Sequence, residues 1–320
     1  MNFQDWKRIN VERLREAGIE YPEEELRLIL SEMFVKKRAT ILFDPNVQID
    51  AIFNQEERRQ IDAVIKGRVE RNPLGYLLGE QFFYRNAFSV GPGVLIPRSD
   101  SELLVGVALY LLGIDDSFLG AKYETLDRVK RIIDSESIKI MDLCAGTGCI
   151  GISIANVLSQ YLVEYNMILT ENSETAKPFL MENMSRAAEP DRIELVMCDL
   201  FPPVSQWKKW AHQVQLIVAN PPYIADHEMD ALMPEVVDHE PQEALRGGRD
   251  GLHFYHRILS EATTFLCSHG VLAVEHGYLQ RKDIENLFLK YGFEDVACLK
   301  DYGDNDRVTI GRWKKGEEEA

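Results

Sequence analysis

A short apolar strand, a glycine turn and a helical pattern, in that order, are the feature that most constrains the fold of this 320-residue chain. Residues 137–143 alternate as in a strand, and the turn Cys144–Gly151 contains three glycines. Apolar residues then recur at helical spacing over 152–158. Glycines allow positive φ and close approach of a ligand, while a helix start has free backbone N–H groups. The sequence therefore predicts an α/β fold with a site for a nucleotide-containing cofactor.

The next apolar run, residues 167–170, ends in Glu171. Its carboxylate could accept hydrogen bonds from both hydroxyls of a ribose. Gly146, Gly148 and Gly151 together with Glu171 also fit a dinucleotide fingerprint, in which the acid follows the turn by about 20 residues. The turn alone therefore does not separate a dehydrogenase from a methyltransferase.

Two further carboxylates favour the methyltransferase. Asp142 stands just before the turn, where it can meet a cationic amino-acid tail directly or through water; there it would repel a dinucleotide's pyrophosphate. Asp199 follows a third apolar run, Ile193–Met197, and offers a carboxylate to an adenine amino group. Because the carboxyl ends of successive parallel strands share one crevice, we expect these side chains to face one ligand.

The sequence Asn220-Pro221-Pro222-Tyr223 directly follows a fourth apolar run, Val214–Ala219. Prolines lack an amide hydrogen, and Pro222 restricts Pro221 to extended backbone, so this strand end offers a carboxamide and carbonyl oxygens without competing donors. A planar amide or an exocyclic base amine could donate to the Asn220 oxygen and the Pro221 carbonyl, with the Tyr223 ring over its face. The motif alone is equally compatible with a turn that closes a strand. Beside the three carboxylates it favours a receptor for an NH2 group.

Together with five further segments, these motifs resemble the HemK/PrmC family of peptide chain release factor glutamine methyltransferases, which are class I S-adenosylmethionine-dependent enzymes. The resemblance covers nearly the whole chain. Its further segments are Pro73–Gly79, Val94–Val105, Glu240–Leu245 with Gly248–Leu252, Glu275–Gly277 and Asp301–Thr309. The Asp301–Thr309 segment is similar to the release-factor branch rather than to the sister branch that methylates a ribosomal protein.

The resemblance implies transfer of a methyl group from S-adenosylmethionine, which becomes S-adenosylhomocysteine, to the N5 atom of the glutamine in the Gly-Gly-Gln motif of class 1 release factors. It implies the catalytic residues Asn220, Pro221, Pro222 and Tyr223, which with Arg98 also bind the substrate. The cofactor-binding residues that it implies are Asp142, Cys144, Ala145, Gly146, Thr147, Gly148, Glu171, Asp199, Leu200 and Asn220. No metal is expected, because His253 and His256 have metal-like spacing without an HExxH context or a carboxylate partner.

Several positions depart from the family pattern. Cys144 and Ala145 replace the first two residues of the usual Gly-Thr-Gly-Ser-Gly, which the fold should tolerate because two glycines remain at the turn. Leu200 stands where the family often has an aromatic residue, so we expect weaker stacking on adenine without loss of binding. Ser99–Ser101 replaces the usual Pro-Glu-Thr, and the roles of its first two residues are left open.

The implied domains are an N-terminal helical substrate-docking domain (residues 1–78), a β-hairpin linker (79–95), a methyltransferase domain (96–315) and a charged tail (316–320). Apolar stripes at helical spacing within 26–34 and 61–69 predict the helices of the first domain. Alternating strand and helix patterns from residue 96 onward predict a Rossmann-like α/β sheet, mostly parallel. The resemblance makes its last strand antiparallel.

Composition bears on partners and location. The net charge of −16 makes the chain a poor general nucleic-acid binder and better suited to a basic protein. No apolar run approaches the roughly 20 residues that cross a bilayer, and no secretory signal opens the chain, so we expect a cytoplasmic enzyme without a membrane partner. A monomer is expected. The five cysteines are expected to be reduced.

Alternative functions remain open at this point. A ribosomal protein glutamine methyltransferase shares all of these motifs, and an N6-adenine DNA methyltransferase would use the same NH2 receptor with an added basic face. A nicotinamide-dependent oxidoreductase shares the glycine turn. A non-catalytic methyltransferase-like module is disfavoured, because Asp142, Glu171, Asp199 and Asn220 occur together.

Overall fold

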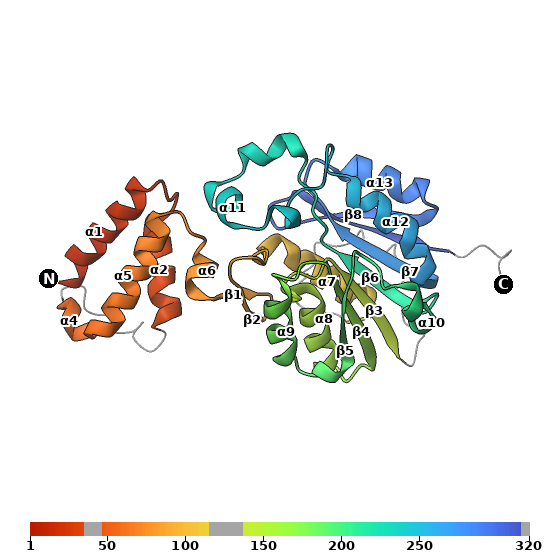
Figure 1. The fold of residues 1–320 in the computed structure, drawn as a ribbon, viewed down its shortest axis with the longest axis horizontal. Coiled ribbons are helices and arrows are strands. Elements are labelled where there is room, and N and C mark those ends of the chain that lie inside the picture. Colours follow the sequence, from red (N-terminus) through yellow and green to blue (C-terminus); the bar gives the residue numbers. More distant parts are fainter. Residues whose placement is uncertain (35–46, 115–136, 315–320) are drawn as a thin grey trace. The chain divides into compact units, whose positions relative to one another are not determined.

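The computed structural model describes residues 1–34, 47–114 and 137–314 and divides into two compact units (Figure 1). Unit 1 comprises residues 1–81, 90–92 and 233–239, and unit 2 comprises 82–89, 93–232 and the chain from 240 onward. The charged tail lies outside the described residues. So do two short basic runs of the sequence, 36–38 and 128–131, and most of 112–137, a stretch whose length exceeds that of a usual connection.

Unit 1 is a small helical bundle, as the apolar stripes predict. Its helices are α1 (Phe3–Glu16), α2 (Pro22–Met33), α4 (Ile49–Ile52), α5 (Gln55–Val69), α6 (Leu74–Leu78) and α11 (Pro234–His239). Leu26 and Ile29 of α2 and Ile61 and Ile65 of α5 are buried in one core. At the start of α5, Asn54 and Glu57 form the expected capping box, which satisfies backbone N–H groups that have no partner inside the helix.

A buried arginine joins α11 to the rest of unit 1. The Arg68 guanidinium is almost fully buried; it pairs with Glu25 and lies 3.2 Å from Glu235 of α11. Arg71 pairs with the other oxygen of Glu235 at 2.6 Å. Nothing in the local sequence pattern indicates this return of residues 233–239, since it depends on two ion pairs across more than 160 positions.

Unit 2 is built on a seven-stranded sheet in the order β5-β4-β3-β6-β7-β9-β8. Its strands are β3 (Ile138–Leu143), β4 (Tyr165–Glu171), β5 (Ile193–Met197), β6 (Val214–Ala219), β7 (Leu266–Glu275), β8 (Phe293–Lys300) and β9 (Asp306–Trp313). β3 to β7 are parallel, and β9 runs antiparallel to β7 and β8. The expected Rossmann-like sheet with an antiparallel last strand is confirmed. The expected hairpin forms from β1 (Glu80–Phe83) and β2 (Asn86–Ser89).

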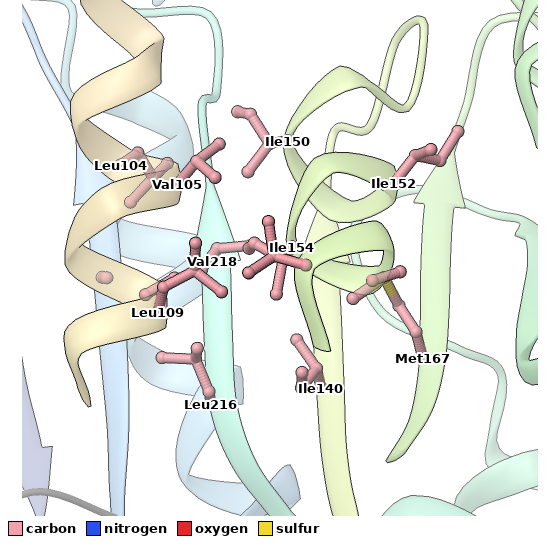
Figure 2. Close-up of a cluster of buried hydrophobic side chains, with 14 of the residues drawn as sticks. Leu104, Val105, Leu109, Ile140, Ile150, Ile152, Ile154, Met167, Leu216 and Val218 are labelled. Atoms are coloured by element: carbon pink, nitrogen blue, oxygen red, sulfur yellow. The ribbon is translucent and has the colours of Figure 1, made fainter. Parts of the chain in front are cut away.

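Helices cover both faces of this sheet, because successive strand side chains point to opposite sides. One core contains Ile140 and Val218 and is covered by α7 (Glu102–Leu111), α8 (Cys149–Gln160) and α9 (Lys177–Ser185); Figure 2 shows side chains of α7 and α8 meeting those of the strands. The other core contains Met141 and Ile217 and is covered by α10 (Trp207–Trp210), α12 (His253–Phe265) and α13 (Arg281–Lys290). Short 3-10 turns occur at Ser99–Ser101, Pro190–Arg192, Val204–Gln206, Asp226–Ala231 and Gln242–Ala244.

The strand order reverses beside β3, which has β4 on one side and β6 on the other. In open α/β sheets, ligands bind beyond the carboxyl ends of the strands at such a switch point. The glycine turn follows β3, and Asn220 follows β6, so the fold places both motifs there. Within the described ranges, no helix is long and apolar enough to cross a membrane.

Replacing Glu235 by Gln should lower the free energy of unfolding of unit 1 by about 1–3 kcal/mol at pH 7, because Arg68 would keep its burial and lose part of its compensating charge. Burial alone would raise the pKa of Glu235, but hydrogen bonds from its own backbone amide and from Arg71 and Arg68 hold that pKa below its ordinary value. A carboxyl group whose pKa is lower in the folded than in the unfolded protein stabilises the fold at pH values above its unfolded pKa. This stabilisation is lost as the pH falls through its folded pKa, so the difference in unfolding free energy between wild type and variant should shrink toward pH 4.

Urea unfolding followed by circular dichroism at pH 7 and pH 4 measures this. Glu70→Gln is the control: it removes an exposed i,i+4 pair with Lys66 and should change stability by less than about 0.5 kcal/mol. A Glu235→Gln variant as stable as the Glu70→Gln variant would contradict the structural role given to α11.

Candidate active site

The glycine turn after β3 has the backbone that the sequence predicts. Gly146 and Gly148 have φ of +56° and +77°, in the left-handed region that favours glycine. A Cβ on Gly148 would meet Leu180 at 2.6 Å, whereas a Cβ on Gly146 would have open space before it. Cys144 also has a positive φ, +57°, although it is not glycine. The turn thus presents bare backbone toward the space beyond β3.

That space is a cavity of about 460 Å³ at the carboxyl ends of the strands. It is lined by residues from the glycine turn, from the ends of β4, β5 and β6, and from the segments around 93–101 and 241–244. Of the residues expected at the cofactor, the cavity wall contains Cys144, Ala145, Gly146, Thr147, Glu171, Asp199, Leu200 and Asn220. Residues predicted from four separate strand ends thus surround one cavity.

Glu171 organises the loops on one side of the cavity. One carboxylate oxygen accepts the Gly146 amide at 2.7 Å, and the other accepts the amides of Asn172 and Ser173 at 2.9 and 2.7 Å. The carboxylate is thereby fixed at the cavity wall with acceptor capacity left for a ligand hydroxyl.

Asp199 also reaches the cavity wall, and it has a partner that the sequence did not reveal. The Arg257 guanidinium of α12 donates to its carboxylate at 2.8 Å. Leu200 follows in a left-handed conformation with φ of +66° and lines the cavity, although it is largely buried. The sequence gives no signal for this role of Arg257. Arg257 lies on α12, which follows β5 by more than 50 residues, and only the order of the strands in the sheet places it beside Asp199.

Asp142 has a backbone partner that the sequence did not reveal. It is 1% exposed and does not line the cavity; its Oδ2 accepts the Gly151 amide at 2.8 Å. A Cβ on Gly151 would lie 2.9 Å from this carboxylate, so glycine is required there for the close approach of α8 to β3. Within the described part of the chain, Oδ1 has no hydrogen-bond partner. Asp142 therefore ties the first turn of α8 to the strand.

The Asn220 side chain lies at the cavity wall, and its Nδ2 donates to the Ser101 hydroxyl at 3.1 Å. The amide oxygen is left for a donor in the cavity. Pro222 also lines the cavity, whereas Pro221 and Tyr223 do not. Burial, followed by the nearby Glu275, raises the pKa of Tyr223 above its ordinary value, so its phenol stays neutral.

Comparison with known proteins shows which family this chain resembles. Residues 7–79 match the model of the PrmC N-terminal domain. The release factor glutamine methyltransferase of Clostridium botulinum is 32% identical over 93% of this chain and 95% of its own length. The proteins of that name from Thermodesulfovibrio yellowstonii and Geobacter sulfurreducens are 35% and 32% identical, over 80% and 96% of this chain and 81% and 94% of their own lengths.

The chain belongs to the release factor glutamine methyltransferase family. Ion pairs join two of the family's other motifs to the Val94–Val105 segment. Glu240 is buried; it accepts the Ile96 amide at 3.2 Å and pairs with Arg98, which lines the cavity. Arg307, from the last motif, lies 3.0 Å from Asp100 and so gives that carboxylate a partner.

Glu275 is the site residue whose side-chain role the sequence missed. It ends β7, is 1% exposed and lies beside Asn220 and Ser101. Burial raises its pKa to about 7, although hydrogen bonds from Ser101 and Asn220 and the charge of Arg307 oppose this. The family resemblance includes Glu275 in one of its motifs, but only the pairing of β6 with β7 shows that Asn220 is its neighbour. In His276, Nδ1 lies 2.9 Å from the Gly277 carbonyl oxygen and Nε2 lies 2.9 Å from the Thr309 hydroxyl, so this side chain supports the strand end.

Replacing Asp142 by Asn should flatten the dependence of stability on pH. Burial raises the pKa of Asp142 to about 7, from 3.8, against the hydrogen bond from Gly151. A carboxyl group whose pKa is higher in the folded than in the unfolded protein stabilises the fold fully at pH values below its unfolded pKa. This stabilisation is lost as the pH rises through its folded pKa. The wild type should therefore lose roughly 2–3 kcal/mol between pH 5 and pH 8 at this residue.

The asparagine variant should lack this loss, since its oxygen can still accept the Gly151 amide. Urea denaturation at pH 5, 6, 7 and 8 without ligand provides the two curves. Parallel curves for the two proteins would show that Asp142 is charged in the folded protein throughout this range.

Proposed function

We propose that the protein transfers the methyl group of S-adenosylmethionine to the N5 side-chain amide nitrogen of the glutamine in the Gly-Gly-Gln motif of class 1 peptide chain release factors. The observation that carries the proposal is the position of Asn220. Its amide oxygen is available at the wall of the same cavity that holds Glu171 and Asp199. Membership of the release factor glutamine methyltransferase family supports the choice of acceptor.

The residues around the cavity fit S-adenosylmethionine. Glu171 would hold the ribose hydroxyls, Asp199 the adenine amino group, and Leu200 would pack on the adenine ring. The open space beside Gly146 leaves room for a ligand against bare backbone. When bound, S-adenosylmethionine supplies an activated methyl group on a sulfonium leaving group. Asp142 would support the cofactor through the glycine turn, because its Oδ2 accepts the Gly151 amide and so holds the start of α8.

The chain's own residues would act mainly by positioning. An amide nitrogen is a poor nucleophile, so correct orientation must supply much of the rate; it can contribute ~7–11 kcal/mol. The Asn220 oxygen and the Pro221 carbonyl would accept the two N–H bonds of the substrate amide. These bonds strengthen as positive charge develops on nitrogen, which stabilises the transition state. Neutral Tyr223 is no base, so the proton would leave to water.

The partner would be a protein. Arg98, held by Glu240, and Tyr223 would complete the substrate side of the site, and the helical bundle of unit 1 would dock the release factor. The net charge of −16 suits a basic protein rather than nucleic acid. The proposal includes a monomeric enzyme and a cytoplasmic location, where release factors act.

The decisive experiment incubates the protein and S-adenosylmethionine with a class 1 release factor, with the same factor carrying Glu in place of the motif glutamine, with ribosomal proteins and with duplex DNA. Mass spectrometry should find one added methyl group, on the Gly-Gly-Gln glutamine alone. A methyl group on a ribosomal protein or on adenine would instead support one of the rival activities.

The Asn220→Ala variant belongs in the same experiment and should lose ~10²–10³ in turnover, as does removal of one preorganised polar group from a reacting centre. Its thermal unfolding should stay close to that of the wild type, because Asn220 is only partly buried. Near-normal turnover in this variant would remove the role given to its amide oxygen.

Replacing Glu171 by Ala should weaken S-adenosylhomocysteine binding about 10- to 100-fold, because hydrogen bonds to a charged group are each worth ~1.5–3 kcal/mol. The variant also frees the Gly146 amide from its acceptor and loosens the glycine turn. Isothermal titration calorimetry measures the affinity. Glu171→Gln is the matched control: it retains an acceptor for that amide and should bind with intermediate affinity. An unchanged dissociation constant in Glu171→Ala would refute the ribose contact.

A further inference from the structure

The orientation of the Asn220 carboxamide poses a physical problem for the proposed reaction. The oxygen and the NH2 group of an amide have almost the same shape and opposite hydrogen-bonding roles. Only the oxygen can accept an N–H from a substrate amide; the flipped side chain would set two donors against each other. Something in the structure must therefore keep the NH2 group turned away from the cavity.

Ser101 receives that NH2 group, with Asn220 Nδ2 at 3.1 Å from its hydroxyl. A hydroxyl group cannot select the orientation alone, because it donates as readily as it accepts. It would equally well donate to the oxygen of a flipped Asn220. The direction of this hydrogen bond must be set by what lies on the other side of Ser101, which is 2% exposed.

Glu275 lies there. Ala219 of β6 pairs with Val274 of β7. The residues that follow them, Asn220 and Glu275, therefore lie next to each other at the carboxyl ends of these neighbouring strands. Val274 is buried in the core under α12 and α13, which turns Glu275 toward the opposite face, where α7 begins directly after Ser101. The side chains of Ser101 and Asn220 both act on its carboxyl group and oppose the rise in its pKa that burial causes.

We propose that Glu275 is a positioning residue that fixes the direction of a hydrogen-bond chain from Glu275 through Ser101 to Asn220. An ionised carboxylate only accepts. It takes the Ser101 O–H, which leaves the Ser101 lone pairs to accept from the Asn220 NH2 group. The Asn220 oxygen then faces the substrate amide. The inference rests on the proposed function, since it explains how the acceptor in that reaction is held.

Two charged side chains of opposite sign act on the Glu275 carboxyl group. The Arg307 charge favours its ionised form and Asp100 opposes it. Tyr255 donates its hydroxyl to the Glu275 backbone carbonyl at 2.7 Å, so it supports the strand without touching the carboxylate. The remaining titratable groups around it are Tyr223, Cys149 and His276. Among the described residues, its Oε2 atom has no hydrogen-bond partner.

The test replaces Glu275 by Gln, which has nearly the same shape and can donate as well as accept. Its NH2 group can point at Ser101 and reverse the chain, so kcat on the release factor should fall about 10- to 100-fold. The KM for the release factor and the affinity for S-adenosylhomocysteine should stay within about twofold. Wild-type kcat should rise as pH passes through 7 and Glu275 ionises, whereas the variant should be flat over that range.

Matched variants separate positioning from mere support of the strand. Ser101→Ala breaks the chain and should match Glu275→Gln, while Ser101→Thr keeps the hydroxyl, as in the usual family sequence, and should restore most of the activity. Tyr255→Phe removes a buried hydrogen bond to the same residue and should lower Tm without lowering kcat. Glu275→Gln with at least half of the wild-type kcat, or with kcat and cofactor affinity reduced together, would overturn the proposal.

An NMR measurement distinguishes failure of this inference about Glu275 from failure of the proposed function. The Asn220 side-chain NH2 resonances should shift between pH 6 and pH 8 in the wild type and stay fixed in Glu275→Gln. If they shift and no release factor is methylated, the hydrogen-bond chain stands and the proposed substrate is wrong. If they do not shift in the wild type, Glu275 does not set the orientation of Asn220, whatever the substrate.

Discussion

The register of the parallel strands is the constraint on which the site depends. One row of paired residues crosses the sheet at its carboxyl edge; it consists of Val196, Thr170, Leu143, Ala219 and Val274. One position further along stand Glu171, Asn220 and Glu275. A slip of one residue in any of these pairings would send the strand side chains to the opposite face. The two buried cores hold the register, because each strand must divide its apolar residues between them.

This dependence also decides how much of the site the sequence could predict. Glu171, Asp199 and Asn220 each directly end or follow an apolar run, so the period of the run and its end suffice to place them at the cavity. The contacts of Glu275 and Arg257 are different, because they depend on which strand neighbours which. β7 follows β6 in space, and α12 packs beneath β5 and β6, only through the order of the whole sheet. No local pattern contains that order.

Asp142 shows the opposite limit of sequence reasoning. Its position beside the glycine turn suggested a ligand contact, and the position itself is as expected. Side-chain direction decides its contacts, because the preceding and following strand residues, Met141 and Leu143, point to the α12 face and Asp142 points beneath α8. The nearest donor there is the Gly151 amide. A charged residue next to a turn can thus stabilise the turn itself.

His276, Tyr223 and Glu275 are the titratable side chains near Asn220 that could be considered as a base, and none of them is a strong one. This agrees with a reaction that depends on positioning the substrate amide. His276 is the natural candidate by residue type, yet burial lowers its pKa below the ordinary value, and both ring nitrogens already have partners. Tyr223 is held neutral by burial. Glu275 is turned to Ser101 and does not line the cavity. A base strong enough to deprotonate an amide would be useless near neutral pH, since it would itself be protonated by water. In the proposed reaction the fold would supply instead a set of acceptors fixed in direction, whose hydrogen bonds to the N–H groups would strengthen as the nitrogen begins to carry charge.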